Sequence, residues 1–123
     1  MGKRVLCVDD DEEVLELLKD TLEPMGCDVT TAADGGEGLE KWNAGPAFDL
    51  LVTDLLVPKL DGIRLAEAVR AKNPEARILV ITAVAHSLEK ELSAAPISGW
   101  LPKPISIGKL KARVRELLSE SGS

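Results

Sequence analysis

Five apolar runs rich in β-branched residues alternate with amphipathic stretches along this chain, and that alternation constrains its fold more than any other feature. A repeated strand-then-helix order produces a parallel sheet whose two faces are covered by helices. The sequence therefore predicts a doubly wound α/β fold. The predicted strands are Arg4–Val8, Asp28–Ala32, Phe48–Thr53, Arg77–Ile81 and Gly99–Leu101.

Proline, glycine and serine mark the ends of the predicted helices. Pro24 and Gly26 end the first helix. Pro96 limits the fourth helix, which begins at about Ser87, to roughly two turns. Ser106 stands where it can cap the last helix.

The length of 123 residues is that of one domain. Apolar residues make up 45% and charged residues 29%, a balance that indicates a globular protein rather than a disordered one. We therefore expect a single domain over residues 1–123, with a core from about residue 3 to 118 and a frayed tail over 119–123.

Charge and hydropathy exclude several classes of function. The net charge of −6 disfavours direct binding to nucleic acid. No apolar run approaches the ~20 residues that cross a bilayer, so we expect no membrane span. The first residues carry no secretory or lipidation signal, and a cytoplasmic location is expected. Cys7 and Cys27 are then expected to be buried, reduced thiols.

Polar residues follow the predicted strands where ligands bind in an open parallel sheet. The first strand leads to Asp9 and Asp10, the third to Asp54, the fourth to Thr82 and the fifth to Lys103. Three carboxylates at one edge repel each other and require a cation or protons. Mg²⁺ fits best, because it prefers oxygen ligands, and a single histidine in the chain argues against zinc or copper.

An aspartate beside Mg²⁺ can act as a nucleophile toward phosphorus, because the metal neutralises the charge that repels an incoming phosphoryl group. A lysine and a hydroxyl facing that aspartate would hold the phosphoryl oxygens. The strand ends therefore predict phosphoryl transfer to an aspartate.

Five motifs in this order resemble the receiver domains of two-component response regulators, over the span from about residue 3 to 118. They are Val8-Asp9-Asp10, Asp34-Gly35, Asp54 with Pro58 and Asp61-Gly62, Thr82-Ala83, and Lys103-Pro104. Each motif alone is weak, but five at these spacings are specific. The resemblance implies a flavodoxin-like (βα)5 fold with strand order 2-1-3-4-5.

The resemblance also implies how a metal would be held. Asp54 is the implied phosphoacceptor. Asp10 and Asp54 would bind Mg²⁺ directly, Asp9 would hold it through water, and Leu56 would contribute its backbone carbonyl.

The implied phosphoryl contacts come from the fourth and fifth strands. The Thr82 hydroxyl, the Ala83 backbone N–H and the Lys103 ammonium would meet the phosphoryl oxygens. A constrained Lys103-Pro104 bond, of the kind that can be cis, is also implied. Thr82 and Trp100 are the implied switch residues, although Trp100 stands where receivers usually carry Tyr or Phe.

The implied activity is that of a signalling phosphoacceptor, which catalyses its own phosphorylation and dephosphorylation, rather than of an enzyme with an external substrate. The implied phosphodonor is a histidine kinase, a histidine phosphotransfer protein or a small phosphodonor. An output domain or target protein would receive the signal. Neither the cognate kinase nor the output can be identified from the sequence.

Three alternative functions make different demands on the sequence. A pseudo-receiver, which is an interaction module without phosphorylation, should lack members of the acidic pocket, and all are present. A flavodoxin-like FMN protein needs a Ser/Thr/Gly-rich loop after the first strand, where Asp9-Asp10-Asp11 stand. A haloacid-dehalogenase-type phosphatase would carry Gly-Thr after its Asp-x-Asp pattern, and turnover of an external phosphomonoester would identify it.

Overall fold

A computed structural model describes residues 2–121 and contains a five-stranded sheet in the order β2-β1-β3-β4-β5. Every neighbouring pair of strands is parallel, so the predicted α/β fold and strand order are confirmed. The strands are β1 (Lys3–Val8), β2 (Cys27–Ala32), β3 (Leu50–Thr53), β4 (Ile78–Thr82) and β5 (Gly99–Pro102). The helices are α1 (Glu12–Leu22), α2 (Gly35–Asn43), α3 (Gly62–Lys72), α4 (Glu89–Ala94) and α5 (Ile107–Ser121), with a 3-10 helix η1 (Glu23–Met25).

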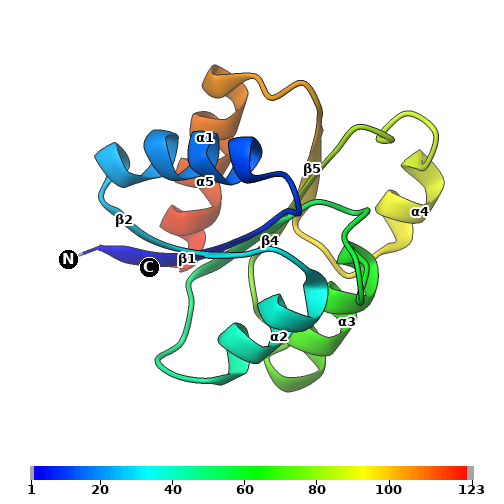
Figure 1. Ribbon diagram of the computed structural model, residues 1–123, viewed down its shortest axis with the longest axis horizontal. Coiled ribbons are helices and arrows are strands. Elements are labelled where there is room, and N and C mark those ends of the chain that lie inside the picture. The colour runs from blue at the N-terminus through cyan, green and yellow to red at the C-terminus, as the bar shows by residue number, and fades with distance from the viewer. Residues whose placement is uncertain (1, 122–123) are drawn as a thin grey trace.

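Helices cover both faces of the sheet, as Figure 1 shows, with α1 and α5 on one face and α2 and α3 on the other. Alternate residues of β1 serve the two faces: Val5 and Cys7 pack in the cluster that includes α1 and α5, and Leu6 and Val8 pack in the cluster that includes α2 and α3. All four are fully or almost fully buried, which is why β1 reads as a continuous apolar run.

Aspartates cap α1, α2 and α3 at the carboxyl edge of the sheet. Asp11 accepts from the Glu13 N–H at 2.9 Å and begins α1. Asp61 accepts from the Arg64 N–H at 2.9 Å and begins α3. Because each cap fixes one strand-to-helix turn, the caps also fix the loops at this edge. The predicted Ser106 cap is confirmed: its hydroxyl accepts from the Lys109 N–H at 3.4 Å.

The third strand begins at Leu50, so the prediction that it begins at Phe48 was wrong. The Arg4 N–H donates to the Asp49 side chain at 2.8 Å, which replaces one backbone bond that would have extended the ladder. Phe48 instead stacks on Trp42, with ring centroids 5.5 Å apart. The Arg4 guanidinium covers the Phe48 ring at 4.2 Å from its centroid.

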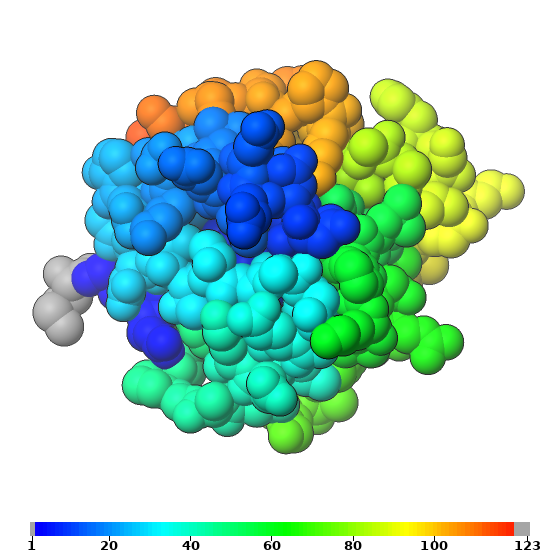
Figure 2. All heavy atoms as spheres, in the orientation of Figure 1, coloured from blue at the N-terminus to red at the C-terminus, as the bar shows by residue number. Residues whose placement is uncertain are grey.

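Other boundaries also differ from prediction: β1 and β2 begin one residue earlier than expected, and β5 ends one residue later. β4 runs one residue later than expected and includes Thr82. Turns occupy residues 83–88, so α4 begins at Glu89 rather than Ser87, and it ends before Ala95, whose extended backbone suits the following Pro96. In Figure 2 the yellow segment that contains α4 forms a lobe at one side of the molecule. α5 continues to Ser121, into the segment expected to fray, and residues 122–123 lie outside the described part.

Both cysteines are free and buried, as predicted. Burial raises the pKa of the Cys7 thiol far above its usual value, because a thiolate would have no solvation there. Among the described residues, no helix is both long enough and apolar enough to cross a bilayer.

Candidate functional site

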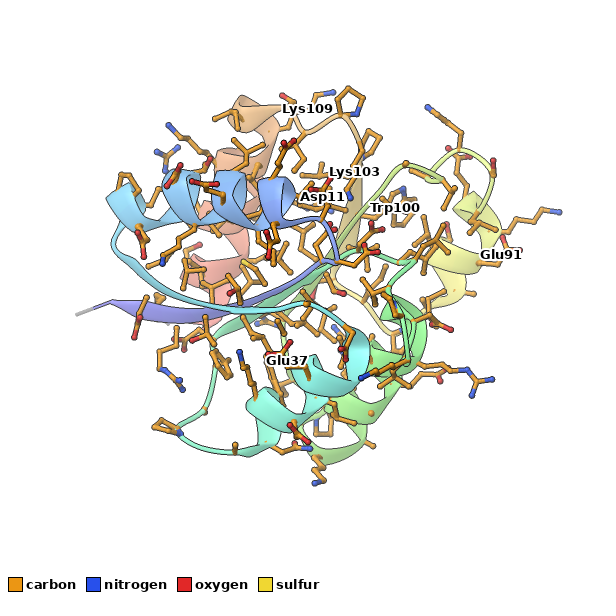
Figure 3. All side chains as sticks on the ribbon, viewed as in Figure 1. Asp11, Glu37, Glu91, Trp100, Lys103 and Lys109 are labelled. Atoms are coloured by element: carbon orange, nitrogen blue, oxygen red, sulfur yellow. The ribbon has the colours of Figure 1, made fainter. Side chains whose placement is uncertain are left out.

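Three side chains from three different strands meet at the carboxyl edge of the sheet. Asp9 follows β1, Asp54 follows β3 and Lys103 follows β5. The Lys103 Nζ atom lies 2.9 Å from Asp9 Oδ2 and 2.8 Å from Asp54 Oδ2. Lys103 is labelled in Figure 3 beside the start of α1, where Asp11 is labelled. One ammonium group therefore joins two carboxylates that are far apart in the sequence.

The register of the sheet explains why these residues meet. Val8 pairs with Thr53 across β1 and β3, so the residues that follow them leave the sheet together. The Asp54 N–H donates to the Val8 carbonyl at 3.0 Å. The Lys103 N–H donates to the Thr82 carbonyl at 3.0 Å, which holds the residue after β5 against the end of β4.

Burial sets the electrostatics of this group. The Asp9 side chain is only 3% exposed, and this burial raises its pKa above the usual range although the Lys103 ammonium acts in the opposite direction. Burial by itself would lower the pKa of Lys103, but the Asp54 and Asp9 carboxylates outweigh it and hold that pKa above its usual value. Lys103 is thus held in its charged form at a partly buried position.

Asp10, the third predicted carboxylate, stands apart from this group. Its side chain is exposed, whereas Asp9 is turned inward and accepts from the Asp11 N–H at 2.9 Å. Within residues 2–121 no three His, Cys, Asp or Glu side chains are arranged to hold a metal ion. The Lys103 ammonium occupies the position between the carboxylates of Asp9 and Asp54.

The donor set nevertheless fits a hard cation. Asp9 and Asp54 already hold one positive group, the Lys103 ammonium, within hydrogen-bonding distance. All the groups expected as ligands are oxygens, including the exposed Asp10 carboxylate and the Leu56 carbonyl, and Mg²⁺ takes such ligands together with water.

The loop between β3 and α3 borders the Asp54 carboxylate. The Leu56 N–H lies 3.3 Å from Asp54 Oδ1, and the Leu56 side chain is 59% exposed. The Gly62 N–H donates to the Leu55 carbonyl at 2.8 Å and closes the loop. A side chain at position 62 would collide with the Asp54 carbonyl, so this approach of α3 requires glycine.

The end of β4 lies beside the same edge. Thr82 is fully buried, and its hydroxyl accepts from the Val84 N–H at 3.4 Å. Ala83 is exposed and begins the turn before α4. The Thr82 carbonyl thus accepts from the Lys103 N–H, while the Thr82 hydroxyl accepts from the Val84 N–H in the turn that follows.

The predicted switch residue Trp100 lies on β5 and is half-buried. It packs against a cluster formed by Leu55, Val80, Ala85 and Leu92, which joins the loop after β3 to β4 and to the segment that includes α4. The Lys103-Pro104 peptide bond is cis, in agreement with the expectation.

Lys59 is a feature that the sequence did not reveal. It has a φ of 71°, a backbone conformation that is uncommon outside glycine. The only signal near it is the loop composition of Pro58 and Gly62, which marks a turn without showing which residue takes the positive φ.

Comparison with known families and proteins agrees with this arrangement. Residues 5–115 match the model of the response regulator receiver domain. The alkaline phosphatase synthesis transcriptional regulatory protein PhoP of Bacillus subtilis is 38% identical over 122 residues, which are 98% of this chain and 50% of that protein. The response regulator MprA of Mycobacterium ulcerans is 39% identical over 119 residues, 96% of this chain and 51% of that protein. The chain therefore spans about half the length of these relatives.

Solved structures give the same result. A CheY-like receiver domain protein from Methanospirillum hungatei has a TM-score of 0.90 and 32% identity, over 99% of this chain and 98% of that one. The response regulator protein TrrA from Thermotoga maritima, solved in complex with Mg²⁺ and BeF, has a TM-score of 0.86 and 34% identity, over 94% of this chain and 99% of that one.

Proposed function

Because this chain belongs to the response regulator receiver family, we propose that it accepts one phosphoryl group on the carboxylate of Asp54. The observation that carries the proposal is the contact of 2.8 Å between Lys103 Nζ and Asp54 Oδ2. A lysine that already contacts the phosphoacceptor is placed to pair with the negatively charged phosphoryl oxygens after the transfer.

The proposal includes a metal at the same edge. Asp10 and Asp54 would bind Mg²⁺ directly, Asp9 would hold it through water, and the Leu56 carbonyl would complete the protein ligands. When bound, Mg²⁺ would neutralise the charge that otherwise repels an incoming phosphoryl group. The likeness to TrrA, which was solved with Mg²⁺ and BeF, supports this choice of cation.

The chemical step is a transfer between two nucleophiles. One oxygen of the Asp54 carboxylate forms a bond to phosphorus while the bond from phosphorus to the donor breaks, and the donor leaves with that electron pair. Lys103 would then pair with the phosphoryl oxygens, and the Thr82 hydroxyl and Ala83 N–H would donate to them. Attack by water on phosphorus would later restore the carboxylate.

The donor in this proposal is a histidine kinase or a histidine phosphotransfer protein. PhoP is named a transcriptional regulator and is about twice the length of this chain, so an output domain or a target protein is proposed to receive the signal. We propose no direct contact of this chain with nucleic acid, because its net charge of −6 repels phosphate backbones.

A pseudo-receiver remains the alternative function. It would need neither a charged pocket nor a lysine held against the phosphoacceptor. The assembled group of Asp9, Asp54 and Lys103 favours phosphorylation instead, because burying three charges without a use costs stability.

Intact-mass measurement tests the proposal. Incubation with acetyl phosphate and Mg²⁺ should add one phosphoryl group to the protein. Asp54→Asn should abolish the addition, and Asp20→Asn, on the exposed face of α1, should leave it unchanged. Labelling of the Asp54→Asn protein, or equal labelling in excess EDTA, would contradict the assignment.

A further inference from the structure

The Asp34-Gly35 pair begins α2, yet it contacts the loop between β3 and α3 that carries Leu56. The Gly35 N–H donates to the Pro58 carbonyl at 3.1 Å. Asp34 Oδ2 lies 3.7 Å from Lys59 Nζ. The N-terminus of α2 therefore holds part of the loop that borders the phosphoacceptor, although neither residue belongs to the site itself.

The contacted part of the loop is a strained turn. The Leu60 N–H donates to the Pro58 carbonyl at 2.8 Å, a bond across two residues, and Lys59 between them has a φ of 71°. This combination describes the γ-turn of positive φ, which is rare and strained. Such a conformation persists only where surrounding contacts determine it.

Gly35 makes the closest of these contacts. A Cβ atom at position 35 would collide with the carbonyl oxygen of Leu60 and would lie 2.8 Å from the Leu60 Cβ. The obstacle includes backbone, so no flexible side chain could move aside. Only glycine lets the first turn of α2 lie directly on the Lys59 turn.

The cap of α2 fixes the direction of this contact. Asp34 Oδ1 accepts from the Glu37 N–H at 2.7 Å, and Glu37, labelled on α2 in Figure 3, accepts from the Ala33 N–H at 2.8 Å. Both bonds hold the strand-to-helix turn after β2. The Gly35 N–H is thereby aimed at Pro58.

We propose that Gly35, supported by Asp34, is a positioning residue for the metal site: it fixes the turn at Lys59 and so the direction of the Leu56 carbonyl. The other end of the loop is fixed by the Gly62 N–H bond to Leu55. The inference rests on the proposed function, which assigns that carbonyl to Mg²⁺. Contacts behind a metal ligand commonly change metal affinity about 10–100-fold when they are removed.

The first test compares Mg²⁺ dissociation constants by titration calorimetry. Gly35→Ala should weaken Mg²⁺ binding by at least about ten-fold. Gly45→Ala is the matched control, because a Cβ there meets nothing within 4 Å. Leu110→Ala is the control for lost stability, since Leu110 is buried in the cluster that includes α1 and α5, on the opposite face of the sheet from α2. Both controls should bind Mg²⁺ within about two-fold of the parent.

The second test needs no substitution and decides the matter if Gly35→Ala does not fold. Coupling is reciprocal, so Mg²⁺ should slow amide hydrogen exchange at Gly35 and Leu60. The Gly38 N–H, which bonds to the Asp34 carbonyl at 2.9 Å, reports on α2 itself and should change less.

The outcomes separate this inference from the proposed function. Normal Mg²⁺ binding by a folded Gly35→Ala protein, or equal weakening in Leu110→Ala, would overturn the positioning role alone. The same holds if Mg²⁺ binds the parent and exchange at Gly35 and Leu60 changes no more than at Gly38. Failure of the parent protein to bind Mg²⁺ would overturn the proposed function, and this inference with it.

Discussion

The ammonium of Lys103 lies 2.8 Å from the Asp54 carboxylate, in a contact between the residues that follow β5 and β3. It also lies 2.9 Å from Asp9, so a single cation of the chain itself contacts two carboxylates of the proposed metal site and offsets part of their charge. Any divalent cation that binds there competes with Lys103 for the same oxygens.

Replacing Lys103 should therefore tighten metal binding while slowing phosphorylation. In Lys103→Gln the carboxylates lose their internal cation, and the Mg²⁺ dissociation constant should fall by about three- to ten-fold. Phosphorylation by acetyl phosphate should slow, because no ammonium meets the phosphoryl oxygens. Lys109→Gln removes the same charge from an exposed position on α5 and should change neither quantity by more than about two-fold. Calorimetry and intact-mass time courses measure both, and weaker Mg²⁺ binding in Lys103→Gln would contradict the competition.

The buried carboxylate of Asp9 should cost the protein stability at neutral pH. The pKa of Asp9 in the folded protein is raised above the usual 3.8, so the folded state binds the proton more tightly than the unfolded state. Stability therefore falls as the pH rises through the interval between the usual pKa and the raised one. Asp9→Asn should raise the midpoint of thermal unfolding in metal-free buffer at pH 7 by a few degrees, since ~1 kcal/mol corresponds to about 4 °C. The gain should fade as the pH falls from the raised folded pKa toward the usual 3.8, because Asp9 then takes up a proton in the folded state.

Exposed Asp10 supplies the control for that prediction, because Asp10→Asn removes a neighbouring charge without removing a buried one. Thermal scans from neutral to acid pH would check both variants. A lower midpoint for Asp9→Asn at pH 7 would show that the Lys103 contact outweighs the cost of burial.

Apolar residues beside Asp54 should make its phosphorylated form long-lived. Leu56 is exposed next to the carboxylate and Val84 lies just after Thr82, and neither can position an attacking water by hydrogen bonding. Leu56→Asn and Val84→Glu should each shorten the phosphoryl lifetime, by about two- to ten-fold. The decay of the phosphorylated mass after removal of the donor measures it, and lifetimes unchanged or lengthened in both variants would refute the idea.

Trp100 should report the signal that leaves the site. It packs on the cluster that contains Leu55 and Ala85, so closure of the loop after β4 would change its surroundings. Beryllofluoride with Mg²⁺ should alter the emission of the Trp42→Phe protein and leave that of the Trp100→Phe protein nearly constant. Trp42 is a sound reference because it is buried and stacked on Phe48.

Acrylamide quenching separates a movement of Trp100 from direct quenching by the bound fluoride. If the indole moves, its accessibility in the Trp42→Phe protein changes along with its emission. Constant emission and constant accessibility would remove Trp100 as the relay.

The interior strands β1, β3 and β4 were predictable because they are largely buried on both faces and therefore read as apolar runs. The start of the third strand was not predictable, since Phe48 is as apolar as Leu50 and Leu51, and the contact of the Asp49 side chain with the Arg4 N–H is not visible in the sequence. Strand propensities of single residues do not show where a side chain replaces a backbone carbonyl as hydrogen-bond acceptor, as the Asp49 carboxylate does for the Arg4 N–H.

The meeting of Asp9, Asp54 and Lys103 could be predicted from their places after parallel strands. Their ion pairing could not, because the sequence does not say whether Lys103 faces a ligand or the carboxylates. The Lys59 turn was equally hidden, since lysine has no preference for positive φ and the strain comes from packing against Gly35.

β1 is the first strand of the chain and also an interior strand of the sheet, with Lys3 paired to Cys27 on one side and Val5 paired to Leu50 on the other. During translation its outer neighbour β2 is released early, but the edge that will meet β3 stays unpaired until Thr53 has left the ribosome. The Asp9 carboxylate gains its ion-pair partner later still, because Lys103 follows the last strand. The order of synthesis thus delays charge neutralisation at this edge until the nascent chain has delivered its fifth strand.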